Sequence, residues 1–468
     1  PEAIIRRVTP LVRRLAPVYL AGIRDPNASR EALFQRSESF IADYHRRYQS
    51  CTTLAQVMPI FEQMIYTPFY TLIPELIPRI GVGYGPLLLL QRFFSRLAQE
   101  DPTVDPQMVL TLTRGLPHNV TTEMDLALWE AARRIRDDGE AQSVMQRGDP
   151  EELAQAYLAG TLPPVAQRAL ADFLDRYGAR GLGEIDLGRP RWRENPTPVI
   201  QSVQSYMAID NPDAAPDVVF RRGAQAAEQA IDALVATASR LRGPAAGWLV
   251  RKLAARVRAM AGLREYPKFT IIRLFGEGRA ALLRAGEDLV QRGVLEQADD
   301  LVFLHLNELW TLALGAPGDW KRLVRARRAV YEREKRRQPI PRLLVSDGAA
   351  FYEGLGAEEA EGEGIIVGSP VSPGVVEGPV RVVFDPHHAQ LQPGEILVCP
   401  GTDPAWTPLF LAAGGLITEV GGMMTHGSVV AREYGIPAVV GVDRATERLR
   451  TGQRIRLDGS RGRIELLD

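Results

Sequence analysis

Apolar residues recur three and four positions apart through most of the first 345 residues, which is the spacing of one buried face of an α-helix. The pattern is clear in residues 123–136 and 278–292, which are rich in Ala, Leu and Arg. Stop and turn signals punctuate it, as at Gly293 directly after the second segment and at Pro150. The sequence therefore predicts a multi-helix region with few strands.

The pattern changes in residues 347–364, which are acidic and rich in glycine and cannot form a core. Beyond them, short β-branched runs separated by Pro and Gly alternate with predicted helices at 406–413 and 428–434. We therefore predict a largely α-helical substrate-binding domain over 1–346, a flexible linker over 347–364, and a compact α/β (β/β/α) domain over 365–468.

Composition excludes several classes of protein. Hydrophobic residues make up 45% of the chain and charged residues 24%, as in ordinary globular proteins. Because 56 basic residues balance 57 acidic ones, no global field would attract nucleic acid or an anionic membrane. The most apolar stretch, 58–94, is interrupted by charges and prolines, so it predicts buried core or a pocket wall and not a membrane span.

The cysteines and the first residues of the chain give two further expectations, on cellular location and on whether the chain is a fragment. The two cysteines, Cys51 and Cys399, have no spacing that suggests zinc or a disulfide framework, which favours the reducing cytoplasm. The chain starts at Pro1 with neither an initiator Met nor a signal pattern, which favours a fragment of something longer.

The densest chemical pattern lies in residues 417–442. There Thr425 is a plausible helix N-cap and Gly435 a helix stop, so His426 is predicted at or near a helix N-terminus. Backbone N–H groups and the helix dipole would favour an anion and a neutral imidazole there, as a phosphoryl carrier needs. On spacing alone, a capping or buried histidine remains the alternative. We assign stabilisation of the phosphoryl group to Gly421, Gly422, Gly427 and Arg432.

Two longer segments, 400–410 and 421–437, resemble the mobile phosphohistidine domain of phosphoenolpyruvate synthase-type dikinases. In that family, the histidine that follows Ser or Thr is phosphorylated by an ATP-grasp domain and then swings to a second active site. The resemblance implies that His426, preceded by Thr425, is the phosphorylated residue and that residues 365–468 form a swivelling domain.

The helical part resembles one branch of these enzymes, the rifampicin phosphotransferases, through residues 115–125, 177–192 and 264–268. Phosphoenolpyruvate synthases carry a barrel of about 200 residues or more after the histidine domain, and this chain stops at Asp468. The resemblance implies that ATP, water and rifampicin become AMP, phosphate and a drug phosphorylated on a hydroxyl, with the β-phosphoryl group carried by the histidine.

Two cations are candidates for the acceptor site. Arg264 and Lys268 are four residues apart and would share a helix face if Pro267 opens the first turn, offering both charges to a phosphoryl group on His426. A solvated basic face is the alternative. The resemblance places this motif at the phosphoacceptor site, and we assign the intervening Glu265 to substrate binding.

Two further groups are candidate substrate contacts. A charged cluster next to turn-prone glycines could bind substrate or tie helices together as a structural ion-pair knot. Its members are Glu184, Asp186, Arg189 and Arg191, together with Trp192. The second group, which could lie near the substrate hydroxyl, is His118, Asn119, Thr121, Thr122 and Glu123. Alternatively, Thr121 or Thr122 with Glu123 onward could form an ordinary helix entrance.

No P-loop is visible, so we expect the chain not to phosphorylate itself from ATP. The expected cofactors, ATP and Mg²⁺, would be bound mainly by an ATP-grasp domain in cis or on a partner subunit, and we assign no metal ligand here. The leading hypothesis is a relay through His426 to a hydroxyl of a small molecule, with rifampicin the best single guess. The same relay onto a phenol, a pyruvate-like or another metabolite acceptor, and a non-catalytic binding protein that retains the fold, remain alternatives.

Overall fold

The computed structural model describes residues 2–337, 341, 343–351, 364–386, 389, 391–402, 406–410, 412–423 and 425–467. Packing divides the chain into two units. Unit 1 comprises residues 1–79, 178–194 and 266–352, and unit 2 comprises residues 80–177, 195–265 and 353–468. Residues 352–363 of the predicted linker lie outside the described residues, and the predicted domain boundaries stay a prediction.

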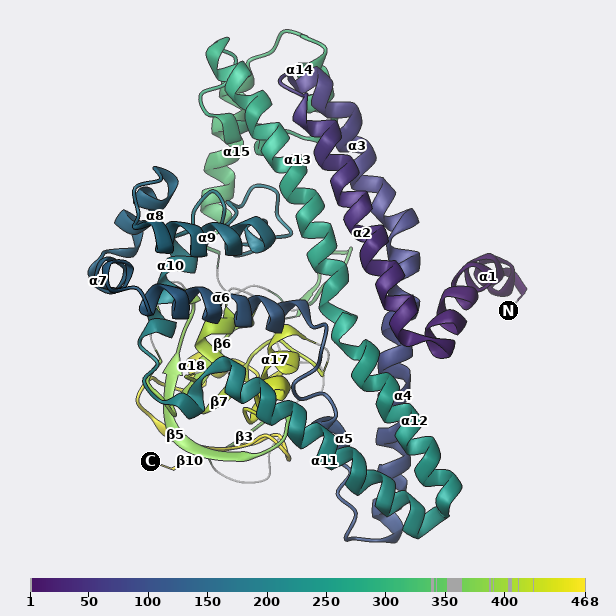
Figure 1. The fold of residues 1–468 in the computed structure, drawn as a ribbon. Helices are drawn as coiled ribbons and strands as arrows, with labels where there is room; N and C mark the ends of the chain where they lie inside the picture. The colour runs from purple at the N-terminus through teal and green to yellow at the C-terminus, as the bar shows by residue number, and fades with distance from the viewer. Residues whose placement is uncertain are drawn as a thin grey trace. The chain divides into compact units, whose positions relative to one another are not determined.

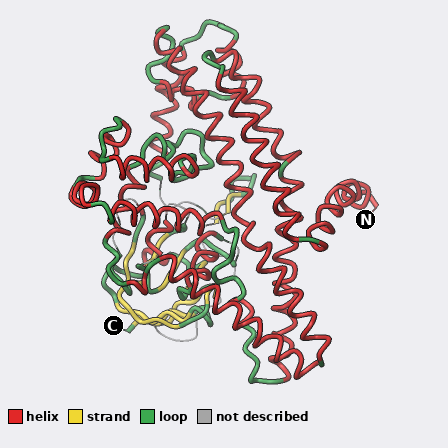
Figure 2. Tube along the Cα trace, in the orientation of Figure 1, coloured by secondary structure: helices red, strands yellow, loops and turns green. Residues whose placement is uncertain are grey.

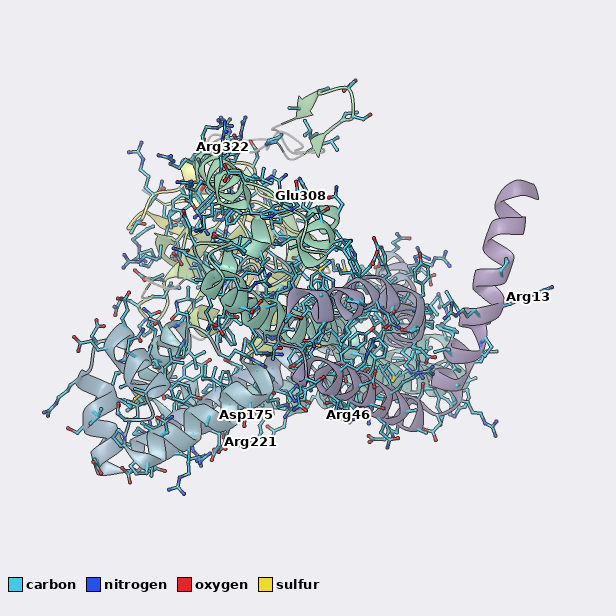
Figure 3. All side chains as sticks on the ribbon, turned by 90° about the horizontal axis from the view of Figure 1, so that it is seen from above. Arg13, Arg46, Asp175, Arg221, Glu308 and Arg322 are labelled. Carbon is cyan, nitrogen blue, oxygen red and sulfur yellow. The ribbon has the colours of Figure 1, made fainter. Side chains whose placement is uncertain are left out.

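Unit 1 is built on long helices. α2, α3 and α13 pack side by side (Figure 1). Its helices are α1 (Glu2–Arg24), α2 (Pro26–Gln49), α3 (Leu54–Thr71), the start of α4 (Ile73–Glu100), α13 (Tyr266–Gln291), η3 (Ala298–Phe303), α14 (Leu306–Ala313) and α15 (Trp320–Glu334). A two-stranded sheet, β1 (Leu343–Leu344) and β2 (Ala350–Phe351), follows. Figure 3 shows Arg46 of α2 and Arg322 of α15 at the surface of this unit.

The Met and aromatic stripe of α3 is mainly core. Met58, Phe61 and Met64 are buried, and a Cβ on Gly278 of α13 would lie 2.6 Å from Met64 Cε. Tyr66 and Tyr70 are instead exposed. The close approach of α13 to α3 therefore accounts for much of the apolar pattern of residues 58–64, because buried faces must be apolar.

The helical part of unit 2 contains the rest of α4 and a set of shorter helices before two long ones. These are α5 (Met108–Thr111), α6 (Val120–Arg136), α7 (Gly139–Arg147), α8 (Pro150–Leu158), α9 (Pro164–Tyr177), α10 (Thr197–Met207), η1 (Pro212–Ala214), α11 (Pro216–Arg242), α12 (Pro244–Met260) and η2 (Ala261–Glu265). α11 and α12 pack together as a hairpin that turns at Gly243, whose φ of +86° favours glycine (Figure 1). α6 packs against α9 and α10.

Unit 2 also contains a mixed eight-stranded sheet in the order β3-β10-β9-β5-β6-β7-β8-β4. Its strands are β3 (Ile365–Val367), β4 (Ser369–Ser372), β5 (Val375–Val382), β6 (Ile396–Cys399), β7 (Gly415–Thr418), β8 (Ala438–Val440), β9 (Arg454–Asp458) and β10 (Arg463–Leu466). Neighbours from β5 to β8 are parallel, and the other pairs are antiparallel. The first and last strands in this order, β3 and β4, are separated in sequence only by Gly368.

Three short helices belong to this α/β part: α16 (Thr407–Phe410), α17 (His426–Tyr434) and α18 (Ala445–Arg448). Figure 2 shows helix dominating the rest of the chain, whereas most strands gather here. The predicted fold class, a largely helical region followed by a compact α/β region, is confirmed. Of the helix predicted at 406–413, residues 407–410 form α16, and residues 412 and 413 are not helical.

None of the helices in the described part of the chain is long and apolar enough to cross a membrane. The apolar stretch at 58–94 instead forms α3 and most of α4, which are separate helices with Leu72 between them.

Candidate phosphotransfer site

His426 is the first residue of α17, as predicted. Thr425 precedes it as the N-cap, in an extended conformation with φ −74° and ψ 161°. The Thr425 hydroxyl donates to Gly422 O at 2.9 Å, and the Ser428 hydroxyl donates to the same oxygen at 2.8 Å. As far as the described residues show, the Thr425 side chain caps no N–H of α17. The N–H groups at the helix start are therefore not taken up by this side chain.

The glycines of the motif allow close packing around the histidine. A Cβ on Gly421 would lie 2.8 Å from Val440 Cβ, and one on Gly427 would lie 2.5 Å from the Thr402 hydroxyl oxygen. Gly435 ends α17 with a φ of +70°, the left-handed conformation that glycine adopts without strain. Gly422 differs, because a Cβ added there would meet no described atom within 4 Å beyond its chain neighbours.

The His426 ring faces a carboxylate from the helical part of unit 2. Its Nδ1 lies 3.9 Å from Glu265 Oε2, and the His426 and Glu265 side chains are 9% and 5% exposed. The Phe410 ring lies edge-on to the imidazole, with ring centroids 6.4 Å apart. Two parts of the chain far apart in sequence thus meet at a partly enclosed imidazole, and Glu265 is one of the predicted site residues.

Arg264 and Arg432 add positive charge beside this pair. Arg264 forms an ion pair with Glu265, and burial lowers its pKa while the Tyr84 phenol opposes that shift. Burial also lowers the pKa of Arg432, with Arg264 among the further causes. Because arginine side chains stay protonated in proteins, both guanidiniums remain cations.

The contacts of Arg432 link strand β4 to the loop before His426. Its guanidinium donates to Val371 O at 3.0 Å and to Met423 O at 2.7 Å. It therefore fastens the loop before His426 to strand β4. Contact of Arg432 with a phosphoryl group stays a prediction. The predicted stabilisation of that group by Gly421, Gly422 and Gly427 also stays a prediction.

Lys268 lies in unit 1, whereas Arg264 lies in unit 2. Arg264 belongs to the 3₁₀ helix η2 and Lys268 to α13, so the continuous α-helix that their spacing predicts is not formed across both residues. Within unit 1, Lys268 Nζ lies 2.9 Å from Glu184 Oε1. The proposed contact of Lys268 with a phosphoryl group stays a prediction.

The charged cluster at 184–191 separates into a buried and an exposed half. Glu184 is 1% exposed and also pairs with the equally buried Arg180 at 3.2 Å. Arg191 is buried, donates to Asp186 O at 3.2 Å, and has a pKa lowered chiefly by burial. The side chains of Asp186 and Arg189 are 52% and 40% exposed and lie 4.0 Å apart. Glu184 thus makes the contacts of an ion-pair knot, while substrate binding by the cluster stays a prediction.

His118 lies in the loop that precedes α6 and has a φ of +63°, a rare conformation for a residue with a side chain. The next residue, Asn119, is the N-cap of α6 and accepts a hydrogen bond from Thr121 N at 3.0 Å. A helix does begin in this segment, but at Val120, before Thr121 and Thr122. A role of His118 near a substrate hydroxyl stays a prediction. A Cβ on Gly262 of η2 would lie 2.3 Å from Pro117 O, so this loop packs closely on the 3₁₀ helix that carries Arg264 and Glu265.

Two buried carboxyls lie close to this site and were not predicted from the sequence. Glu433, on α17, accepts a hydrogen bond from Asn119 Nδ2 at 2.6 Å and another from the Thr122 hydroxyl. Asp125, on α6, accepts from the hydroxyls of Tyr206 and Tyr434. Burial raises the pKa of Glu433 to about 7 and that of Asp125 to about 6, against the opposing effect of these hydrogen bonds. The partners on α17 and α6 are more than 300 residues apart, so no local pattern indicated them.

Two family models match the chain. Residues 75–265 match the rifampicin phosphotransferase fourth domain, and residues 391–462 match the mobile domain of PEP-utilising enzymes. A probable phosphoenolpyruvate synthase of Staphylothermus marinus is 43% identical over 106 residues, which cover 22% of this chain and 13% of that protein.

Longer matches are to rifampicin phosphotransferases. The enzyme of Streptomyces sviceus is 40% identical over 361 residues, and that of Bacillus subtilis is 36% identical over 360 residues. Each match covers 76% of this chain and 41% of the relative, so the chain spans about two fifths of the length of these proteins. The resemblance predicted from the motifs is therefore confirmed: the chain carries a rifampicin phosphotransferase fourth-domain region followed by a mobile domain of the PEP-utilising enzymes.

Proposed function

We propose that this chain is the acceptor and phosphohistidine part of a dikinase-type phosphotransferase. In this proposal His426 carries the β-phosphoryl group of ATP and transfers it to a hydroxyl of a small molecule, with rifampicin the best single candidate. The overall reaction converts ATP, rifampicin and water to AMP, phosphate and phosphorifampicin. The observation that carries the proposal is the meeting of His426, at the start of α17, with Glu265 of the matched fourth-domain region.

The geometry supports a nucleophilic role for the imidazole. A proton on Nδ1 would be directed towards the Glu265 carboxylate, which makes Nε2 the nitrogen whose lone pair attacks phosphorus. The N–H groups at the start of α17 favour the negative charge of the resulting phosphohistidine. The cationic Arg264, beside Glu265, would offset charge on the phosphoryl group during transfer.

Transfer to the acceptor then exchanges two bonds. The acceptor oxygen bonds to phosphorus as the N–P bond to His426 breaks, and the imidazole recovers its lone pair. The hydroxyl proton passes to a base, for which the Glu265 carboxylate is our candidate. From the resembling motifs alone, we also propose that Lys268 and the cluster of Glu184 and Arg191 contribute to acceptor binding.

ATP and Mg²⁺ enter this proposal through an ATP-grasp domain, in cis or on a partner subunit. The metal ion would offset the charge of the ATP phosphates during the first transfer. The residues of this chain act afterwards, by accepting, holding and releasing the phosphoryl group. We assign no magnesium ligand to this chain.

Mass spectrometry of the chain, mixed with an ATP-grasp domain, ATP and Mg²⁺, tests the proposal. We expect an acid-labile phosphate on His426 that is absent from His426→Gln and is discharged onto rifampicin when the drug is added. Phosphorylation without discharge would favour another acceptor, such as a phenol or a pyruvate-like metabolite. Drug binding without any phosphohistidine would instead favour the non-catalytic binding protein and contradict the relay.

A further inference from the structure

Helix α17 carries His426 at its first residue and is anchored to the helical part of unit 2 near its last residues. Glu433 and Tyr434 lie at the C-terminal end, seven and eight positions after His426, or roughly 10 to 12 Å along the helix axis. Glu433 is 2% exposed and Tyr434 9% exposed. The nucleophile and the anchor therefore occupy opposite ends of one rigid element.

Each of the two parts supplies one buried carboxyl to this anchor. From α17, Glu433 reaches Asn119 and Thr122 at the start of α6. From α6, Asp125 accepts from Tyr434 of α17 and from Tyr206 of α10. Each side thus buries one carboxyl against hydrogen-bond donors from the other side. Because each carboxyl would be hydrated if the two parts separated, its protonation state is linked to docking.

Few charged groups oppose the effect of burial on the pKa values of these two carboxyls. Around Glu433, Arg432 on the same helix and Arg258 on α12 favour the ionised form, while burial disfavours it more strongly. The Tyr84 phenol on α4 also interacts with Glu433. Around Asp125, the two tyrosine hydroxyls are the groups that oppose the effect of burial.

We propose that Glu433 and Asp125 form a proton-dependent latch that holds the His426 helix docked on α6 and must open each time the mobile domain leaves. The inference rests on the proposed function in one respect, since a domain that carries a phosphoryl group between two sites has to undock. The latch itself concerns docking alone, and no phosphoryl group takes part in it. Glu433 acts on transfer only as a positioning residue.

The linkage between protonation and docking gives the direction in which docking changes with pH. The pKa of Glu433 is about 7 when docked and near its ordinary value of 4.5 when hydrated, so protonation favours the docked state. The stabilisation is complete below pH 4.5 and is lost as the pH rises through 7. From Glu433 alone, the docking constant should fall about tenfold between pH 6 and pH 8.

Single-molecule energy transfer on the full chain measures this constant without ATP or acceptor. Dyes can be attached to cysteines introduced at the exposed positions Glu130 on α6 and Arg456 on β9, because Cys51 and Cys399 are both buried. We expect the ratio of docked to undocked molecules to fall at least about tenfold from pH 6 to pH 8, because Asp125 adds a smaller fall to that of Glu433. Glu433→Gln, which carries no titrating carboxyl, should lose most of this dependence.

Glu395→Gln is the matched control, because Glu395 is a buried carboxylate that pairs with Arg381 inside the α/β part. It should respond to pH as the wild type does. Asp125→Asn combined with Glu433→Gln should abolish the response, and thermal melts of each variant identify any that fail to fold. A wild type that shows no pH response, or a Glu433→Gln variant that keeps the whole response, would overturn the latch. Absence of phosphohistidine in the earlier experiment, together with an intact pH response here, would overturn the relay alone.

Discussion

Adjacent glycines in the loop before His426 differ sharply in what surrounds them. The Cβ position of Gly421 is blocked by Val440 at 2.8 Å, whereas no atom of the described residues, chain neighbours aside, lies within 4 Å of that of Gly422. Val440 belongs to strand β8 and cannot move without disturbing the sheet. The conformation of this loop therefore depends on the first glycine more than on the second.

We predict that Gly421→Ala lowers the free energy of unfolding by about 1–3 kcal/mol, because the added methyl group overpacks a rigid contact. Gly422→Ala should stay within about 0.5 kcal/mol of the wild type. Urea unfolding of the two variants measures the difference. Similar losses in both would contradict the packing argument.

At the scale of the residue, local sequence was sufficient for the histidine and its turn. Thr425, His426 and Gly435 occupy the N-cap, first-residue and C-cap positions that their order predicted. Glu433 was not recognisable, because a glutamate in a short amphipathic helix is ordinarily exposed. Its burial is decided by Asn119 and Thr122, which are distant in sequence.

At the scale of the element, Arg432 connects helix α17 to strand β4 and to the loop before His426 through the carbonyls of Val371 and Met423. We predict that Arg432→Met lowers the free energy of unfolding by about 2–3 kcal/mol, because the buried Val371 carbonyl and the part-buried Met423 carbonyl lose charged donors. Amides of residues 419–425 should also exchange with solvent faster. Hydrogen exchange measures this, with the exposed Arg450→Met as the control. Unchanged exchange in residues 419–425 would contradict the role of Arg432.

The spacing of Arg264 and Lys268 shows where element prediction failed. Four residues suggest one helix face, but the α-helix begins only at Tyr266, after a 3₁₀ turn. Pro267 lacks an N–H group and cannot donate back to Leu263, so it suits the first turn of a new helix better than the interior of a longer one. The proline signal was recognised, but its consequence for the residues before it was not.

At the scale of the whole molecule, periodicity could predict a helical region but not its packing. Unit 1 combines three separate segments, including residues 178–194, whose Glu184 pairs with Lys268 of a distant segment. Such contacts depend on side chains that no local spacing relates. The change of pattern near residue 365, in contrast, was readable because strands and helices require different periods.

Residues 347–364 give a prediction at this scale. If they tether a moving domain, shortening them should reduce turnover of the reconstituted enzyme well below that of the wild type while leaving the melting temperature nearly unchanged. A rate assay and a thermal melt on the same variant measure both. Equal losses in both would indicate a structural role instead. Replacing these residues with a Gly/Ser sequence of the same length is the control.

The path of the chain through β3 and β4 has a consequence for solubility. The first and last strands in the sheet order, β3 and β4, have three and four residues. They are joined in sequence by Gly368, and β4 contains Pro370. Short edges with proline are poor templates for adding a strand from another molecule. An α/β region that spends part of its time away from its docking surface would thus resist aggregation through its sheet edges.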